Sequence, residues 1–538
     1  MHVFIPVFLL FVGAVAVSAQ HRNDDQLRMI AVKQLCVDES AVEKLCERDH
    51  LVAFTSKGGH GLVVVARDGD QTEILGYAEG QLDANTLPDG LIWWMETTNA
   101  SIASGHRRKA DVPFTPTENF ALTKWGQKQP YNLLCPVSGG RTLTGCAATA
   151  LSQAMKIFNY PLRSEGSATY YVKNRAEQPK TLNTEYSWNL MADEYHSNLD
   201  AQTDENLSVA ELLRDCGYAV SMNYSTGNSA AYTSDVAVAL TRNFGYDDHS
   251  IRYAMRDYYS NEEWMTIIYD ELANHHPVVF SGIDELGSGH AFLFSGVDAV
   301  GRIYVNWGWD GVADGFFDFS DLAPANIQGN LGQRHYNNEQ EMVFGITPEP
   351  DLAAIDAIYS EWVTTSTGYL SSIPQNNLMR LGPLKFYNYH YQPFVGTIDL
   401  VFEQAGKDTH LINIYKATDA KPVKNTSGFS LTKAVTLTAI PAGTYNVYMG
   451  TKAGGDVKYR PLRVPGGPVS YEVTKAENGT VTVSNAHTWT DAITNVTVRS
   501  PQSATYRYSL TGQPIGRSQH GIQVVKMTDG SVRKQYVR

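Results

Sequence analysis

The sequence predicts an α+β protein built from several folded units. In the central part of the chain, stretches with helical spacing of apolar residues come first and strand-like runs follow them, which is the order typical of α+β folds. Beyond residue 350 the chain is almost purely strand-like. Its length of 538 residues exceeds that of one domain, so we expect about three or four units.

The composition excludes several classes of protein. The content of 43% hydrophobic and 18% charged residues is that of globular domains rather than of a disordered chain. A formal net charge of -13 argues against nucleic acid or an anionic membrane as the main partner. The five cysteines are too few for a disulfide scaffold, and neither CxxC nor HExxH occurs, so we expect no metal site and no cofactor.

Residues 1–19 are predicted to be a signal peptide. An apolar run from Val3 to Val17 leads into small residues that end at Ala19, the pattern of a secretory cleavage site. No other stretch reaches the roughly 18 apolar residues that a membrane-spanning helix needs. We therefore expect a protein that is secreted, extracellular or held at the cell surface, without a transmembrane helix; a buried N-terminal helix is the alternative.

Residues 20–111 are predicted to form a small α+β unit. Residues 51–69 have the pattern of a β-hairpin that turns at Lys57-Gly58-Gly59, and residues 89–102 have that of a helix. Residues 105–112 are basic, small and free of apolar periodicity. They are predicted to be a linker, and Arg107-Arg108-Lys109 would be accessible to cleavage there.

Residues 112–350 are predicted to hold helices followed by an antiparallel sheet. Helical periodicity covers 146–158, 207–216, 234–243 and 261–275. Successive strands are expected at 276–283, 290–299 and 302–309, with Gly301 in the turn between the last two. Residues 351–487 show short alternating strands at the spacing of a β-sandwich, and residues 488–538 are expected to be a small β module.

Cys146 is the candidate nucleophile. It follows Gly145 and opens a helix with one apolar stripe, and a thiol at a helix N-terminus lies at the positive end of the helix dipole, which favours the thiolate. The glycine lets the chain approach closely, and the backbone N–H of Cys146 would point toward a substrate oxygen. For an isolated cysteine, however, a packed core position is the commoner role, and a disulfide to Cys135 is a second alternative.

A cysteine nucleophile needs a histidine, a group that orients this histidine, and donors for the oxyanion. His290 begins a predicted strand, and the next strand returns antiparallel to it with Asn306 and Trp307. An asparagine can exchange a hydrogen bond with an imidazole, and a tryptophan ring can shield that bond from water. Together these residues favour a reactive Cys146.

The central segment resembles the streptopain (interpain-like) family of cysteine peptidases, which have a papain-like fold. The separation of Cys146 and His290 falls within the ~130–150 residues found in papain-like enzymes. The matching segments follow one another in the right order and are GQKQPYN (126–132), TGCAATALSQAMKIFNYP (144–161), LLRDCGYAVSMNY (212–224), NFGYD (243–247), GHAFLFSGVD (289–298) and YVNWGWDGVADGFF (304–317).

This resemblance implies a papain-like catalytic domain over 112–350, with a helical half and an antiparallel β-sheet half. It is preceded by an α+β prodomain and followed by β-sandwich-like modules. The implied catalytic residues are Cys146 as nucleophile, His290 as proton acceptor, Gln127 in the oxyanion hole, and Asn306 and Trp307 to orient and shield His290. We also assign three residues to substrate binding, namely Gly145, Gly289 and Trp309. The loop at 225–232 matches the family only loosely, so the substrate side-chain preference stays open.

The resemblance extends to both ends of the chain. Residues 25–104 are similar to the propeptide of the family, which implies a zymogen that its own propeptide inhibits and that is cut within 105–112. A stable accessory domain without inhibitory function is the alternative. Residues 488–538 resemble C-terminal sorting tails of some secreted bacterial proteins, and a plain small β module is the alternative for them.

The sequence therefore predicts a secreted cysteine endopeptidase that is made as a zymogen and acts on protein and peptide substrates. Two other hypotheses remain. One is a peptidase-like adhesin or inhibitor that binds a host or cell-surface protein without turnover. The other is an amidase that uses the same Cys/His chemistry on cell-wall peptide.

Overall fold

The computed structural model describes residues 21–489 and three later strands between 504 and 537. Gaps within 21–489 fall at 70, 83–86, 105–111, 249, 284–288, 321–339, 349–361, 365–367, 389–392, 423–427 and 454–457. The predicted signal peptide and all but the last residue of the predicted linker thus lie outside the described residues. Within the described part, no helix has both the length and the apolar character to cross a membrane.

The N-terminal unit, residues 21–104, is a four-stranded meander with two helices. Its elements are α1 (Asp24–Leu35), β1 (Val42–Glu47), β2 (Leu51–Ser56), β3 (His60–Ala66), β4 (Ile74–Gln81) and α2 (Asp89–Ala103). The predicted hairpin is the antiparallel pair β2–β3, and the predicted helix is α2. The sequence analysis did not anticipate α1. Its N-cap, Asn23, forms a reciprocal capping box with Gln26, and its C-cap, Cys36, is left-handed.

The central unit, residues 112–348, confirms the predicted order of helices and then sheet. Its longer helices are α3 (Cys146–Phe158), α4 (Asp204–Ala219), α5 (Thr233–Asn243) and α6 (Asn261–Ala273). Its main strands are β10 (Arg252–Met255), β11 (Val278–Ile283), β12 (Gly289–Val297), β13 (Ile303–Asn306), β14 (Gly315–Phe317) and β15 (Gln340–Phe344). Short two-residue strands, β5 to β9, lie between 167 and 224. Gly301 makes the β12–β13 turn with a positive φ of 87°.

The sheet of the central unit lies between two layers of helices. Side chains alternate across β11 and β12, as the two-residue period of a strand requires. Phe280 and Phe292 enter the core that includes α2 and α6, whereas Val279 and Leu293 enter the core that includes α3, α4 and α5. The α3 helix rests on β12, and this contact places the start of α3 beside the start of that strand.

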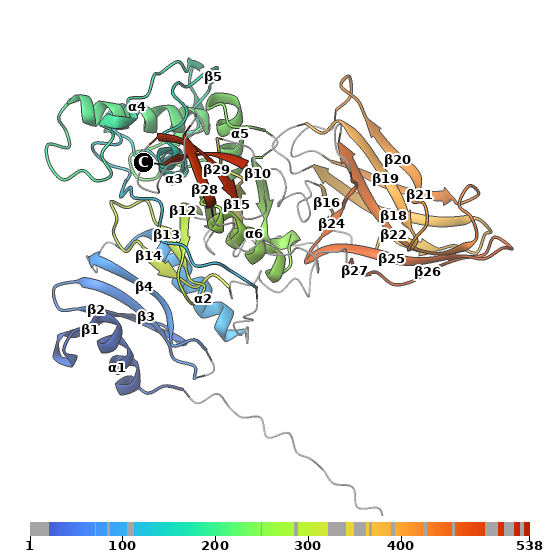
Figure 1. Cartoon of the computed structure of the whole chain (residues 1–538), viewed down its shortest axis with the longest axis horizontal. Coiled ribbons are helices and arrows are strands. Elements are labelled where there is room, and N and C mark those ends of the chain that lie inside the picture. The colour runs from blue at the N-terminus through green and yellow to red at the C-terminus, as the bar shows by residue number, and fades with distance from the viewer. Residues whose placement is uncertain are drawn as a thin grey trace, which may run out of the picture.

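The N-terminal and central units share one sheet. Among the described residues, ten strands run in the order β1-β2-β3-β4-β14-β13-β12-β11-β15-β10, and Figure 1 shows the blue strands continuing into the β14–β13 hairpin. The junction is the antiparallel pair β4–β14, in which Ala78 faces Gly315. A side chain on Gly315 would begin 2.2 Å from the carbonyl oxygen of Tyr77, so this close approach requires glycine. The sequence analysis expected a separate prodomain and did not foresee this pairing.

The C-terminal unit, residues 362–489, consists of strands around one apolar core. Its strands are β16 (Trp362–Thr364), β17 (Leu370–Ser372), β18 (Leu378–Asn388), β19 (Gly396–Glu403), β20 (His410–Ala417), β21 (Gly428–Thr436), β22 (Gly443–Ala453), β23 (Arg460–Pro461), β24 (Arg463–Val464), β25 (Gly467–Lys475), β26 (Val481–Val483) and β27 (His487–Thr488). Both the β18 side and the β22 side contribute to the core, which is the arrangement of a sandwich.

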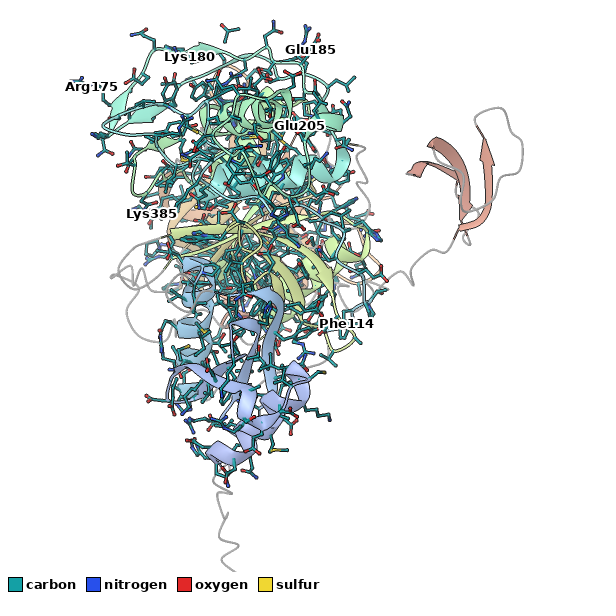
Figure 2. The ribbon with its side chains drawn as sticks, turned by 90° about the vertical axis from the view of Figure 1, so that its left-hand side faces the viewer. Phe114, Arg175, Lys180, Glu185, Glu205 and Lys385 are labelled. Atoms are coloured by element: carbon teal, nitrogen blue, oxygen red, sulfur yellow. The ribbon has the colours of Figure 1, made fainter. Side chains whose placement is uncertain are left out.

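A further antiparallel sheet contains β28 (Ala504–Ser509), β29 (Gly521–Met527) and β30 (Val532–Val537). Figure 2 shows this sheet apart from the rest of the chain. The same view places Arg175, Lys180 and Glu185 at the end of the central unit that is farthest from the N-terminal unit.

A buried ion pair holds the C-terminal unit against the central unit. The Arg463 guanidinium donates to a Glu263 carboxylate oxygen at 2.6 Å and to the Tyr258 carbonyl oxygen at 2.7 Å. It also lies 3.9 Å from the centre of the Tyr259 ring. Glu263 in turn accepts from the backbone N–H of Ser260 and so caps α6. Because all of these groups are buried, the contact joins two folded units rather than two exposed surfaces.

We expect Arg463→Met to destabilise the protein by about 3–5 kcal/mol, because the buried Glu263 carboxylate would lose the guanidinium that is hydrogen bonded to it. The matched control is Arg163→Met, which breaks the exposed pair of Arg163 and Glu185 and should cost no more than about 1 kcal/mol. Urea unfolding of the full chain, followed by fluorescence, measures both. Equal effects of the two substitutions would contradict the assigned role of Arg463.

Candidate active site

The candidate nucleophile lies where the helical and sheet halves of the central unit meet. Cys146 is the first residue of α3 and is half-buried. Gly145 precedes it with a φ of 87°, and a side chain there would begin 2.4 Å from Met222 Cε and 3.0 Å from the Ser229 carbonyl oxygen. Only glycine fits both this φ and this space.

His290 lies on β12 and faces Cys146 across the boundary of the two halves. Its side chain is 8% exposed and is hydrogen bonded to the Cys146 thiol. Its Nε2 lies 3.3 Å from the carbonyl oxygen of Trp307. The imidazole thus interacts with the Cys146 thiol and with the main-chain oxygen of Trp307.

The two groups shift each other's pKa toward an ion pair. Burial tends to raise the pKa of the Cys146 thiol, but the hydrogen bond and charge of His290, together with the N–H groups of Ala291 and Ala147, lower it overall. Burial likewise tends to lower the pKa of His290, but Cys146, the Trp307 carbonyl and the charge of Asp89 raise it overall. A lowered thiol pKa beside a raised imidazole pKa favours thiolate and imidazolium.

Gln127 lies beside the start of α3. Its carbonyl oxygen accepts the N–H of Thr144 at 3.2 Å, which ties the Gln127 segment to the turn that leads into Cys146. The half-buried Gln127 side chain makes no hydrogen bond to another described residue.

The hydrogen bonds of the Asn306 side chain go to groups other than His290, unlike the expectation from the sequence. Its amide pairs reciprocally with the amide of Gln153 at 2.9 and 3.0 Å and donates to the Thr123 carbonyl oxygen at 2.6 Å. The group that accepts from His290 is the main-chain carbonyl of Trp307. The reason is the pleat: β13 turns the Asn306 side chain toward α3, on the face opposite the Trp307 ring.

Both tryptophans lie near His290, in different surroundings. The Trp307 ring is fully buried and packs on Phe292 and Phe317, while its carbonyl faces His290. The ring of half-buried Trp309 lies 6.3 Å from the imidazole centre. Trp309 is thus the less buried of the two tryptophans near His290. Gly289 is exposed at the start of β12, and residues 284–288 before it lie outside the described part.

Cys135 is not bonded to Cys146. Both thiols are free, and Cys135 is buried. Burial raises the pKa of its thiol to about 12, so it carries no reactive thiolate near neutral pH. The disulfide alternative, which would have removed the nucleophile, therefore does not hold.

The N-terminus of α2 covers the histidine. A side chain at Gly90 would begin 2.7 Å from His290 Cδ2 and 2.7 Å from the Trp307 ring, so the α2 backbone lies directly on both. A side chain at Gly282, the residue paired with His290 on β11, would likewise begin 2.1 Å from the Trp93 ring. The sequence analysis did not single out these α2 residues, although Asp89-Gly90 at a helix start was a visible signal.

Gln153 is a second residue that the sequence analysis missed. It is fully buried on α3 and follows Cys146 by seven residues, so both lie on one face of the helix. The signal in the sequence was a long amide inside an otherwise apolar helical stripe.

Comparison with known proteins gives consistent similarities. The model of the Peptidase C10 family matches residues 125–317. The chain is 32% identical to Streptopain of Streptococcus pyogenes over 319 residues, which is 54% of this chain and 78% of that protein. It is 27% identical to the Thiol protease/hemagglutinin PrtT of Porphyromonas gingivalis over 341 residues, or 58% of this chain, and it spans only 39% of that protein. The solved structure of a Prevotella intermedia prointerpain A fragment, mutant C154A, matches at 30% identity and a TM-score of 0.49, covering 57% of this chain and 99% of that one.

We expect Cys146 to be alkylated by iodoacetamide faster than the exposed Cys36 at pH 6, by about 10-fold or more, because its thiol pKa is lowered. The thiolate is lost as the pH falls below the lowered pKa of Cys146, and the imidazolium is lost as the pH rises above the raised pKa of His290. The excess of the Cys146 alkylation rate over that of Cys36 should therefore decrease on both sides. Mass spectrometry of the two cysteine peptides measures the rates. If the rate at Cys146 rises with pH only in parallel with that at Cys36, there is no ion pair.

Proposed function

The chain belongs to the streptopain-like Peptidase C10 family of cysteine peptidases, and on this premise we propose that it is a secreted cysteine endopeptidase made as a zymogen. The observation that carries the proposal is the hydrogen bond between the Cys146 thiol and the His290 imidazole, with pKa values shifted toward an ion pair. Secretion is proposed from residues 1–19 and the substrates from the chemistry of the site.

The proposed reaction is hydrolysis of a peptide bond in two halves. The Cys146 thiolate attacks the carbonyl carbon, and the His290 imidazolium gives its proton to the leaving amine as the C–N bond breaks. Water then attacks the thioester, His290 takes the water proton, and the C–S bond breaks to release the acid and restore the thiolate.

The developing oxyanion needs donors beside the sulfur. The backbone N–H of Cys146 at the start of α3 is one candidate, since the first N–H groups of a helix have no partner within it. The amide of Gln127 is the second, because it makes no hydrogen bond to a described residue and its backbone is fixed to Thr144. We propose Gly145, Gly289 and Trp309 as parts of the surface that binds the substrate around this point.

The N-terminal unit is proposed to be the inhibitory propeptide. The start of α2 lies on His290 and Trp307, where a substrate main chain would have to pass, and Trp93 covers the strand behind His290. Cleavage between α2 and the central unit, within 105–112, would allow α2 to leave. The shared β4–β14 pairing means that release also requires a strand to separate from the sheet.

We expect Cys146→Ala to abolish hydrolysis of a casein-like substrate by the processed enzyme, whereas Gln127→Ala should lower kcat by about 10²–10³-fold through the loss of one oxyanion donor. Cys135→Ala is the matched control, because it removes a buried thiol from the same unit and should leave kcat unchanged. Steady-state kinetics measure all three.

Full activity of Cys146→Ala would refute the peptidase proposal. Binding of protein substrate without any thiol-dependent hydrolysis, even after removal of residues 20–111, would favour an adhesin or inhibitor instead. Hydrolysis of cell-wall peptide but not of protein would favour the amidase.

We expect Gly90→Ala to speed conversion of the zymogen by about 10-fold, because the added methyl group would overlap His290 and Trp307, and overpacking of ~1–3 kcal/mol weakens the contact. Alanine is also the better helix former, so α2 itself is not weakened. Ile92→Ala, an exposed position on the same helix, is the control. The rate of appearance of the mature fragment is the measurement, and slower conversion of Gly90→Ala would contradict the covering role of α2.

A further inference from the structure

The peptide unit between Trp307 and Gly308 is bound at both of its polar ends. Its carbonyl oxygen lies 3.3 Å from His290 Nε2, and its N–H, that of Gly308, donates to Asn306 Oδ1 at 2.9 Å. Resonance couples the two ends of one peptide group. A hydrogen bond accepted from the N–H therefore fixes the plane of the group and strengthens its carbonyl as an acceptor. Asn306 thus acts on His290 through a peptide rather than by contact.

Asn306 itself is fixed by Gln153. The two buried amides exchange two hydrogen bonds, Gln153 Nε2 to Asn306 Oδ1 and Asn306 Nδ2 to Gln153 Oε1. Gln153 lies two helical turns after Cys146 on α3, and Asn306 ends β13. This pair therefore joins the helix that carries the sulfur to the hairpin that holds the imidazole.

The orientation of the Gln153 amide is determined by a backbone N–H, which can only donate. The backbone N–H of Trp125 donates to Gln153 Oε1 at 3.2 Å, and the Thr123 hydroxyl donates to the same oxygen at 2.9 Å. The Nε2 group must then face Asn306, whose own oxygen faces the Gly308 N–H. Since Trp125 lies two residues before Gln127, a single side chain contacts the segments of the nucleophile, the histidine and the oxyanion candidate.

We propose that Gln153 is a positioning residue for the catalytic pair, which holds the His290 imidazole on the Cys146 sulfur through Asn306 and the Trp307–Gly308 peptide. This inference rests on the proposed peptidase function. A side chain that only filled the core would need none of these four hydrogen bonds. Its replacement would lower stability and leave the chemistry of the thiol unchanged.

The test is Gln153→Glu, which keeps the size of the side chain and the accepting oxygen but loses the donor to Asn306 Oδ1. Its matched control is Asn243→Asp, another buried amide in the same unit, 4% exposed, which donates to the Glu165 carbonyl oxygen at 2.8 Å and lies outside the pair. Gln153→Met, uncharged and of similar length, is a second variant in case the carboxyl prevents folding. Thermal unfolding checks that each variant folds.

The first measurement is the pH dependence of Cys146 alkylation by iodoacetamide in the full chain, which needs no processing. The charged or titratable groups that face His290 are Cys146 from α3 and Asp89 from α2, and Asp314 accepts from the Trp307 N–H. None of these three residues is substituted in the variants. The proposal predicts that the fast reaction of Cys146 at pH 6 falls about 10–100-fold in Gln153→Glu and Gln153→Met, since a misplacement of ~1 Å can cost about 10²-fold. Asn243→Asp should keep the wild-type profile.

The second measurement is hydrolysis after processing on immobilised wild-type enzyme, where kcat should fall by the same factor and KM should change less than about 2-fold. Wild-type alkylation profiles and kcat in folded Gln153 variants would overturn the proposal, and so would an equal loss in Asn243→Asp. A wild-type enzyme that shows the fast alkylation but no hydrolysis would instead refute the peptidase function and leave the positioning role standing.

Discussion

The hydrogen bond between Cys146 and His290 is the interaction on which this structure depends. Neither residue is reactive by its environment alone, because burial opposes the charged form of each. Their contact is the largest of the effects that reverse both shifts. The contact exists because α3 rests on β12. The buried Gln153–Asn306 pair also joins α3 to the sheet. The reactive pair can therefore form only when the helical and sheet halves are packed together.

The N-terminal unit takes part in the same architecture. Its strands extend the central sheet through β4–β14, and α2 lies in the core layer with α6. This arrangement explains how the start of α2 is held against His290. The backbone at Gly90 lies so close to the imidazole that only glycine fits there. It also implies that the sheet of the mature enzyme has β14 at its edge. Arg463 binds the C-terminal unit to the start of α6. The C-terminal unit is therefore packed against the central unit.

Much of this arrangement could be predicted from the sequence, and the rest could not, for physical reasons. The α3 helix, the β12–β13 hairpin and the Cys146/His290 pair follow from local periodicity, turn residues and the spelling of nearby segments. The partner of Asn306 was missed because the pleat decides which face a strand residue occupies, and a one-residue change reverses it. The β4–β14 pairing and the contact of Arg463 with Glu263 join segments about 200 residues or more apart. No local pattern specifies such contacts.

The most direct measurement is side-by-side incubation of the wild-type chain and Cys146→Ala, followed by N-terminal sequencing of the fragments. If the pair at the boundary is a working catalytic centre covered by the N-terminal unit, only the wild type generates a new N-terminus within 105–112. Addition of mature wild-type enzyme should then process Cys146→Ala at the same place. Identical fragments from both chains incubated alone, or none from either under conditions where the chain is folded, would contradict this account.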